Sequence, residues 1–252
     1  MLKDPQRETV LIFGATSAIA AEVAVIWASR GARLMLVGRS PAKLSAVAAR
    51  CGGVEVEQLV ADLGEPANNE RIVATCIARL GHVDSVLIAH GDLGDQLASE
   101  RSFEEAERIL RINFTSVVAL LVPVANHMEQ TGRGRVAVIT SVAGDRGRPR
   151  NYTYGAAKGA LNVYLQGLRS RLYPTGVSVT TIKLGPVDTP MTRTHKKSAV
   201  FGEVPSVARD IVKAIDTRSG DTYVPAFWSA IMPIVRNTPE PLFQRLPFLS
   251  GR

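Results

Sequence analysis

The sequence predicts an α/β fold in which a doubly wound parallel sheet is covered by helices on both faces. Short apolar runs, typical of buried strands, alternate with longer segments of helical periodicity over residues 9–190. Parallel strands need long crossover connections, and helical crossovers cover both faces of the sheet. No linker interrupts this series, so residues 1–252 are expected to form a single domain with a short apolar extension at the C-terminus.

The first elements form a βαβ unit. Thr9–Phe13 is a continuous apolar run bounded by Gly14, residues 18–30 have helical spacing before a glycine, and residues 33–37 form a second apolar run. A serine and a proline then mark a helix start at 40–41. Further strands are expected at about 54–61, 84–89, 135–140, 177–183 and 222–225, and further helices at about 69–80, 103–128, 152–173 and from 206 onward. This order indicates a Rossmann-type domain.

Composition narrows the functional classes. The chain has 252 residues, of which 46% are hydrophobic and 21% charged, which suffices for one ordered core without disulfides or metals. Cys51 and Cys76 show no metal-ligand or disulfide spacing, so no metal site is expected. The first ten residues are charged, and no run reaches the roughly 18 uninterrupted apolar residues of a spanning helix, so a cytoplasmic protein is expected.

The net charge of +7 is compatible with nucleic acid, an anionic membrane surface or a phosphorylated cofactor as partner. Lys and Arg are scattered, with small groups at 146–150 and 193–197, and do not form one dense stripe interleaved with aromatic residues. Nucleic acid is therefore not expected as a partner.

Residues 14–20, Gly-Ala-Thr-Ser-Ala-Ile-Ala, lie where the first strand passes into a helix. Backbone N–H groups and the helix dipole favour a pyrophosphate at such a turn. At the end of the second strand, Gly38 is followed by Arg39, with no acidic neighbour to hold ribose hydroxyls. The Arg39 guanidinium can donate bidentate hydrogen bonds to a 2′-phosphate, so NADP(H) is expected in preference to NAD(H).

Tyr154 and Lys158 have the i, i+4 spacing that places a phenol and an ammonium on one face of a helix. A nearby cation favours phenolate, so Lys158 is expected to lower the pKa of Tyr154 toward the working range. Ser141 comes before this helix, at the end of the strand 135–140, and Asn113 lies on the long helix 103–128.

These residues occur in the order and spacing of the short-chain dehydrogenase/reductase family, which the sequence resembles over residues 9–190. The resemblance implies that Ser141 polarises a substrate carbonyl, Tyr154 transfers a proton, and Asn113 helps to hold a water in a relay to Lys158. It implies a cofactor site made of Gly14, Thr16, Ser17, Ala18, Ile19, Arg39, Asp62, Leu63, Ala89, His90, Gly91, Tyr154, Lys158, Pro186, Val187 and Thr189.

Several positions depart from the family pattern. Ala18 and Ala20 replace the second and third glycines of the turn, Leu184 replaces a proline, and residues 88–91 read Ile-Ala-His-Gly instead of Asn-Asn-Ala-Gly. The extra methyl groups are tolerable where the backbone stays helical and obstructive where it must approach phosphate. A dinucleotide-binding sensor or scaffold without turnover therefore stands as the alternative to a reductase, although the Asn, Ser, Tyr and Lys set is complete.

Two segments bear on the substrate. Residues 191–205, with Arg193, Lys196 and Lys197, are expected to form a basic lid over an anionic substrate, or else a solvated loop. The C-terminal tail, residues 223–252, is rich in aromatic and aliphatic residues, and is expected to meet a membrane interface, a partner subunit or its own core.

The C-terminal tail and residues 89–94 also resemble the ketoreductases that act with an oxidase in 2-epimerisation of decaprenylphosphoryl ribose. This similarity implies a lipid-linked keto sugar, whereas a 3-oxoacyl, steroid or small-ketone substrate would require no membrane contact. By resemblance, the helices 103–128 and 152–173 are expected to join subunits of a homodimer or homotetramer.

Overall fold

The computed structural model describes residues 7–192 and 200–247. Its centre is a seven-stranded parallel sheet in the order β3-β2-β1-β4-β5-β6-β7. The strands are β1 (Thr9–Phe13), β2 (Arg33–Gly38), β3 (Val56–Val60), β4 (Ser85–Ile88), β5 (Arg135–Ser141), β6 (Ser178–Leu184) and β7 (Asp221–Val224). The predicted doubly wound α/β fold is therefore confirmed.

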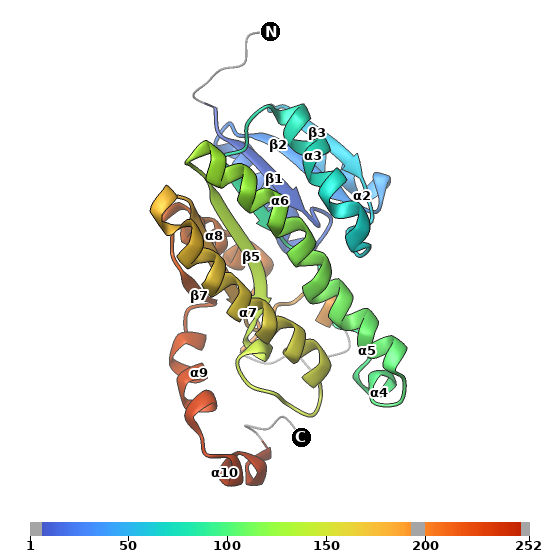
Figure 1. Ribbon diagram of the computed structural model, residues 1–252, viewed down its shortest axis with the longest axis vertical. Helices are drawn as coiled ribbons and strands as arrows, with labels where there is room; N and C mark the ends of the chain where they lie inside the picture. Colours follow the sequence, from blue (N-terminus) through green and yellow to red (C-terminus); the bar gives the residue numbers. More distant parts are fainter. Residues whose placement is uncertain (1–6, 193–199, 248–252) are drawn as a thin grey trace.

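Helices cover both faces of the sheet. The main ones are α1 (Ala18–Ser29), α2 (Pro41–Arg50), α3 (Asn69–Leu80), α5 (Phe103–Leu110), α6 (Ser116–Thr131), α7 (Tyr152–Leu172) and α8 (Val204–Asp216). One apolar core joins α1, α2 and α8 to the sheet, and a second joins α3, α6 and α7 to the other face. In Figure 1, α3, α6 and α7 lie in front of the sheet and α8 lies behind it.

Some boundaries differ from the sequence prediction. The helix expected over 103–128 consists of α5 and α6, joined by the π-helical turn η2 (Arg111–Thr115). The strand expected over 54–61 is limited to Val56–Val60, and α8 begins at Val204, because Pro205 suits the first turn of a helix. The short helix α4 (Gln96–Ser99), capped by Asp95, was not predicted.

The segment Phe103–Thr131 has the length and apolar composition of a membrane-crossing helix. The sequence did not predict such a helix, because the segment contains no uninterrupted apolar run of about 18 residues. In its most apolar window, 44% of the residues are buried inside the protein, and core helices of soluble proteins have the same composition. Its buried residues pack with α3 and α7 in the second core.

The sheet order reverses direction between β1 and β4, whose strands pair in parallel. In doubly wound folds, ligands bind outside the carboxyl ends of the strands at this switch point. All of the predicted site residues that follow β1, β2, β4 and β5 therefore come to the same edge of the sheet.

The C-terminal tail forms the helices α9 (Trp228–Asn237) and α10 (Glu240–Arg245). Both lie at the lower end of the molecule in Figure 1, beyond β7. Trp228, Met232, Val235 and Phe243 are buried in a small third core together with Val142, which directly follows β5. The tail thus packs in part against its own domain, one of the three predicted alternatives.

Candidate active site

Gly14 forms the turn between β1 and α1. Its φ of +78° lies in the left-handed region, and a Cβ at this position would come within 2.5 Å of the backbone N of His90. The N–H groups of Gly14 and Ala15 donate to the carbonyl of Val37, which fixes the turn against β2. Only glycine fits here, and the resulting cradle at the end of β1 fits the pyrophosphate of a dinucleotide.

Ser17 caps α1, because its side chain accepts a hydrogen bond from the N–H of Ala20 at 3.2 Å. Ala18 is the first residue of the helix, and Ala20 is fully buried in the core between α1 and the sheet. Neither alanine requires a positive φ. The two departures from the glycine pattern therefore occupy ordinary helical positions, and the first-turn N–H groups remain directed toward the cradle.

Arg39 is exposed directly after β2, beside the cradle. It forms no salt bridge with any residue in 7–192 or 200–247, so its guanidinium is free to bind an anion. Gly38 precedes it, and a Cβ there would lie 3.1 Å from the Thr16 side chain. An acidic side chain at position 38, which would hold ribose hydroxyls, has little room.

The residues after β3 and β4 also lie at the edge of the sheet where the cradle is found. Asp62 is exposed and its carboxylate accepts the N–H of Gly64 at 2.9 Å, whereas Leu63 is buried in the second core. His90 lies against Gly14, and its Nε2 is 2.9 Å from the hydroxyl of Ser116.

The Ser116 hydroxyl itself donates to the carbonyl of Ile112 at 2.8 Å, so its oxygen accepts a hydrogen bond from the Nε2–H of His90. Burial, with Lys158 and then Arg39 nearby, lowers the pKa of His90 to about 3. His90 is thus neutral at physiological pH.

Ser141, Tyr154 and Lys158 come together at the end of β5 and the start of α7. The Ser141 and Tyr154 hydroxyls are close enough to hydrogen-bond. The Lys158 Nζ lies 5.7 Å from the centre of the Tyr154 ring and donates to the carbonyl of Ile139 at 3.2 Å. The i, i+4 spacing on one helix explains the approach of the phenol and the ammonium.

The pKa expectation for this pair was wrong. Burial raises the pKa of Tyr154 to about 12, against the lowering effect of the Ser141 hydrogen bond, and Asp92 raises it further. Burial also lowers the pKa of Lys158 to about 8. Desolvation is the largest cause of both shifts, because the low-dielectric site disfavours the charged form of each group. Tyr154 is therefore a neutral proton donor at pH 7, and Lys158 is still mostly protonated.

Asn113 is fully buried in the π-helical turn η2. Its Nδ2 donates to the carbonyls of Asp92 at 2.6 Å and Ile109 at 2.9 Å, and its Oδ1 accepts the Asp92 N–H at 3.2 Å. A Cβ on Gly91 would approach Asn113 Oδ1 to 2.9 Å and Lys158 Nζ to 3.4 Å. Because Gly91 has no side chain, the Asn113 amide and the Lys158 ammonium can both approach the segment after β4. Asn113 lies in a π-helical turn, and such turns are frequent at functional sites.

The segment after β6 lies beside Ser141, whose hydroxyl donates to the carbonyl of Leu184 at 3.3 Å. Val187 is buried and pairs with Gly202, while Pro186 and Thr189 are part-buried. The buried Val187 side chain belongs to the core around α1 and α8. The basic residues of the predicted lid, Arg193, His195, Lys196 and Lys197, lie outside the described residues.

Sequence reasoning missed the glycines that join the serine loop to α7. A Cβ on Gly144 would lie 2.7 Å from the backbone of α7, at Gly159 N, and a Cβ on Gly155 would lie 2.8 Å from the carbonyl of Ala143. Because Gly144 and Gly159 both lack a side chain, the backbone of the serine loop contacts the backbone of α7 directly. Their spacing, Gly-x-x-x-Gly within α7 opposite Gly144, was the available signal.

Comparison with known proteins agrees with this geometry. The family model for short chain dehydrogenases matches residues 8–199. An uncharacterised oxidoreductase of Streptomyces coelicolor is 32% identical over 242 residues, covering 94% of this chain and 95% of the relative. An uncharacterised oxidoreductase of Mycobacterium tuberculosis is 30% identical over 249 residues, covering 98% of this chain and all (100%) of the relative.

Solved structures extend the comparison. Levodione reductase has a TM-score of 0.81 at 25% identity, covering 88% of this chain and 98% of that one. A short-chain dehydrogenase from Sphingobium yanoikuyae, solved with NADPH, has a TM-score of 0.77 at 28% identity, covering 92% and 97%. With the parallel sheet, the Gly14 cradle and the Ser141, Tyr154 and Lys158 cluster, these matches show that the chain is an oxidoreductase of the short-chain dehydrogenase family.

Proposed function

We propose that the protein is an NADPH-dependent ketoreductase. The observation that carries this proposal is the meeting of a neutral Tyr154 phenol, the Ser141 hydroxyl and the Lys158 ammonium beside the Gly14 cradle. A reductase needs a proton donor at the carbonyl oxygen, and the raised pKa of Tyr154 keeps that proton available at pH 7.

The residues divide the reaction among them. NADPH would supply a hydride, with its pyrophosphate at Gly14 and its 2′-phosphate at Arg39. Ser141 donates a hydrogen bond to the substrate oxygen as negative charge develops there, and Tyr154 delivers the proton. Lys158 stabilises the phenolate that remains, and the fixed Asn113 amide supports the path for its reprotonation.

The preference for NADPH is tested by replacing Arg39 with alanine. Charge-assisted hydrogen bonds contribute about 1.5–3 kcal/mol, so Arg39→Ala is expected to weaken NADPH binding about tenfold or more while NADH binding stays unchanged. Tryptophan fluorescence titrations measure both affinities. Arg50→Ala, an exposed arginine at the far end of α2, is the control. Equal losses for the two cofactors would contradict the assignment.

A lipid-linked keto sugar is the second substrate candidate, beside 3-oxoacyl, steroid and small ketones. Three apolar side chains of the C-terminal tail are exposed, Phe227 by 42%, Ile234 by 66% and Leu242 by 49%, and Arg236 and Arg245 are exposed near them. Apolar side chains beside cations suit an anionic lipid surface. The active site and this surface lie at the same end of the strands.

Vesicle flotation separates these substrate classes. We expect the protein to float with phosphatidylglycerol vesicles and not with phosphatidylcholine vesicles, and Ile234→Asp to abolish the association. Leu97→Asp changes a side chain on α4 that is also 66% exposed and serves as the control. If the protein floats with neither kind of vesicle, this result favours a 3-oxoacyl, steroid or small-ketone substrate over a lipid-linked keto sugar.

We also propose a cytoplasmic homo-oligomer. Phe103, Val122 and Val163 are exposed apolar residues on α5, α6 and α7, with exposed fractions of 79%, 46% and 68%. Burying such side chains favours association of identical faces in a dimer or tetramer.

A further inference from the structure

The serine segment (Ser141–Arg148) is held between two parts of the protein. On one side, Gly144 packs directly on the backbone of α7, the helix that carries Tyr154 and Lys158. On the other side it meets the C-terminal tail. The family model ends at residue 199, so the tail lies beyond the part of the chain that the family model matches.

Val142, Asp145 and Arg146 join the serine segment to β6, β7 and the tail. Val142, next to the catalytic serine, packs in one core with Trp228 and Phe243. The Asp145 carboxylate accepts the Tyr223 hydroxyl at 2.6 Å and pairs with Lys183 at 3.0 Å, and both side chains of this ion pair are about 95% buried or more, with exposures of 5% and 3%.

Arg146 makes the most extensive of these contacts. Its Nη1 donates to the carbonyls of Val235 at 2.7 Å and Thr238 at 2.5 Å, at the end of α9, and its Nη2 pairs with Glu240 at 2.7 Å. The guanidinium also stacks 3.8 Å from the centre of the Phe243 ring. The Arg146 side chain is only 13% exposed, so its part-buried bonds to the carbonyls of Val235 and Thr238 are stronger than surface bonds, whereas the Glu240 carboxylate is 66% exposed.

The tail also contacts the segment that follows β6. A Cβ on Gly185 would collide with the indole of Trp228, and the Gly185 N–H donates to the carbonyl of Val224 at 2.9 Å. The Leu184 carbonyl, one residue earlier, accepts the Ser141 hydroxyl. The tail therefore contacts the end of β5, which carries Ser141, and the end of β6, which pairs with it.

We propose that the C-terminal tail positions the catalytic serine, with Arg146 as the positioning residue that ties the serine segment to α9 and α10. Arg146 does not face the reacting atoms; it acts through Ser141. Loss of this tie removes the bonds from the serine segment to α9 and α10 and leaves only the contacts of Val142 and Asp145 and the packing on α7, so the Ser141 hydroxyl is held less precisely relative to Tyr154. Misplacement of a catalytic group by about 1 Å can cost about 100-fold in rate.

The proposal rests on the reductase function above, and a double-mutant cycle tests it. Arg146→Ala is expected to lower kcat about 10- to 100-fold with little change in NADPH affinity. In a Ser141→Ala background, Arg146→Ala is expected to have almost no further effect on kcat, because the Ser141 hydroxyl that Arg146 positions is already absent. Arg209→Ala, an exposed arginine of α8, is the control. An equal loss of kcat in both backgrounds would overturn the proposal.

Hydrogen exchange gives a readout that needs no turnover and so separates this proposal from the proposed function. Amides of residues 141–148 are expected to exchange faster in Arg146→Ala and to be unchanged in Arg209→Ala. If Arg146→Ala fails to fold, Tyr223→Phe removes a single hydroxyl from Asp145 and enters the same cycle. Unchanged exchange in this segment would refute the positioning role even where the wild-type enzyme reduces ketones.

Discussion

Tyr154→Phe is expected to lower kcat about 10²- to 10⁴-fold, the usual contribution of a positioned general acid. The phenylalanine ring keeps the packing beside Lys158, whose Nζ lies 5.7 Å from the ring centre, and removes only the proton donor. NADPH affinity is therefore expected to stay within about twofold of wild type. Steady-state NADPH oxidation with a ketone, together with a fluorescence titration of NADPH, measures both quantities.

Tyr152→Phe provides the matched control for this experiment. Tyr152 begins the same helix, but its side chain is 45% exposed and its hydroxyl makes no hydrogen bond with residues 7–192 or 200–247. We expect wild-type kcat for this variant. A Tyr154→Phe enzyme that kept more than about a tenth of its turnover would remove Tyr154 from the role of acid and revive the interpretation of the protein as a sensor without turnover.

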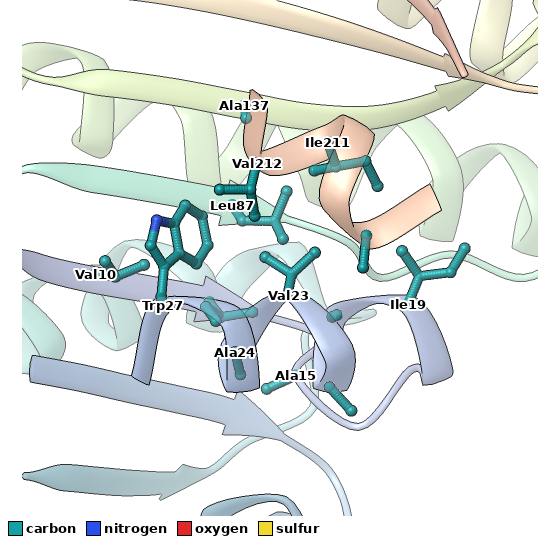
Figure 2. Close-up of a cluster of buried hydrophobic side chains, with 14 of the residues drawn as sticks. Val10, Ala15, Ile19, Val23, Ala24, Trp27, Leu87, Ala137, Ile211 and Val212 are labelled. Carbon is teal, nitrogen blue, oxygen red and sulfur yellow. The ribbon is translucent and has the colours of Figure 1, made fainter. Parts of the chain in front are cut away.

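Trp27→Ala has the largest expected effect on stability. Trp27 is fully buried between α1 and the sheet, and Figure 2 shows its indole beside Val10, Val212 and Leu87. Truncation of a buried tryptophan costs about 3–5 kcal/mol of unfolding free energy. For a domain of this size, the corresponding fall in Tm is on the order of 10 °C.

The core around Trp27 also supports the site, because α1 carries the cradle at its start. Calorimetry or denaturant unfolding measures the change, and Tyr173→Ala, with a side chain 81% exposed, is the control that is expected to stay within about 0.5 kcal/mol of wild type. A loss below about 1 kcal/mol for Trp27→Ala would mean that the helix layer of α1 and α8 repacks around the cavity.

The resemblance predicted which residues form the site, but the pKa expected for Tyr154 was wrong. Ser141, Tyr154, Lys158 and Asn113 meet as their order along the chain implied. Their ionisation was predicted from one pair alone, as an ammonium beside a phenol. Burial acts on both groups and depends on every neighbour in space, so spacing could not predict that desolvation raises the pKa of Tyr154.

Local patterns determined the strand and helix series, the glycine at position 14 and the phenol–ammonium pair, because each depends on neighbouring residues or on the periods of helix and strand. Only the tertiary structure decided how distant segments meet. The helical placement of Ala18 and Ala20, the π-helical turn around Asn113 and the bonds from Arg146 to α9 all depend on contacts between residues far apart in the chain. Packing and burial are collective properties, and they determine how the tail and the catalytic serine are held together.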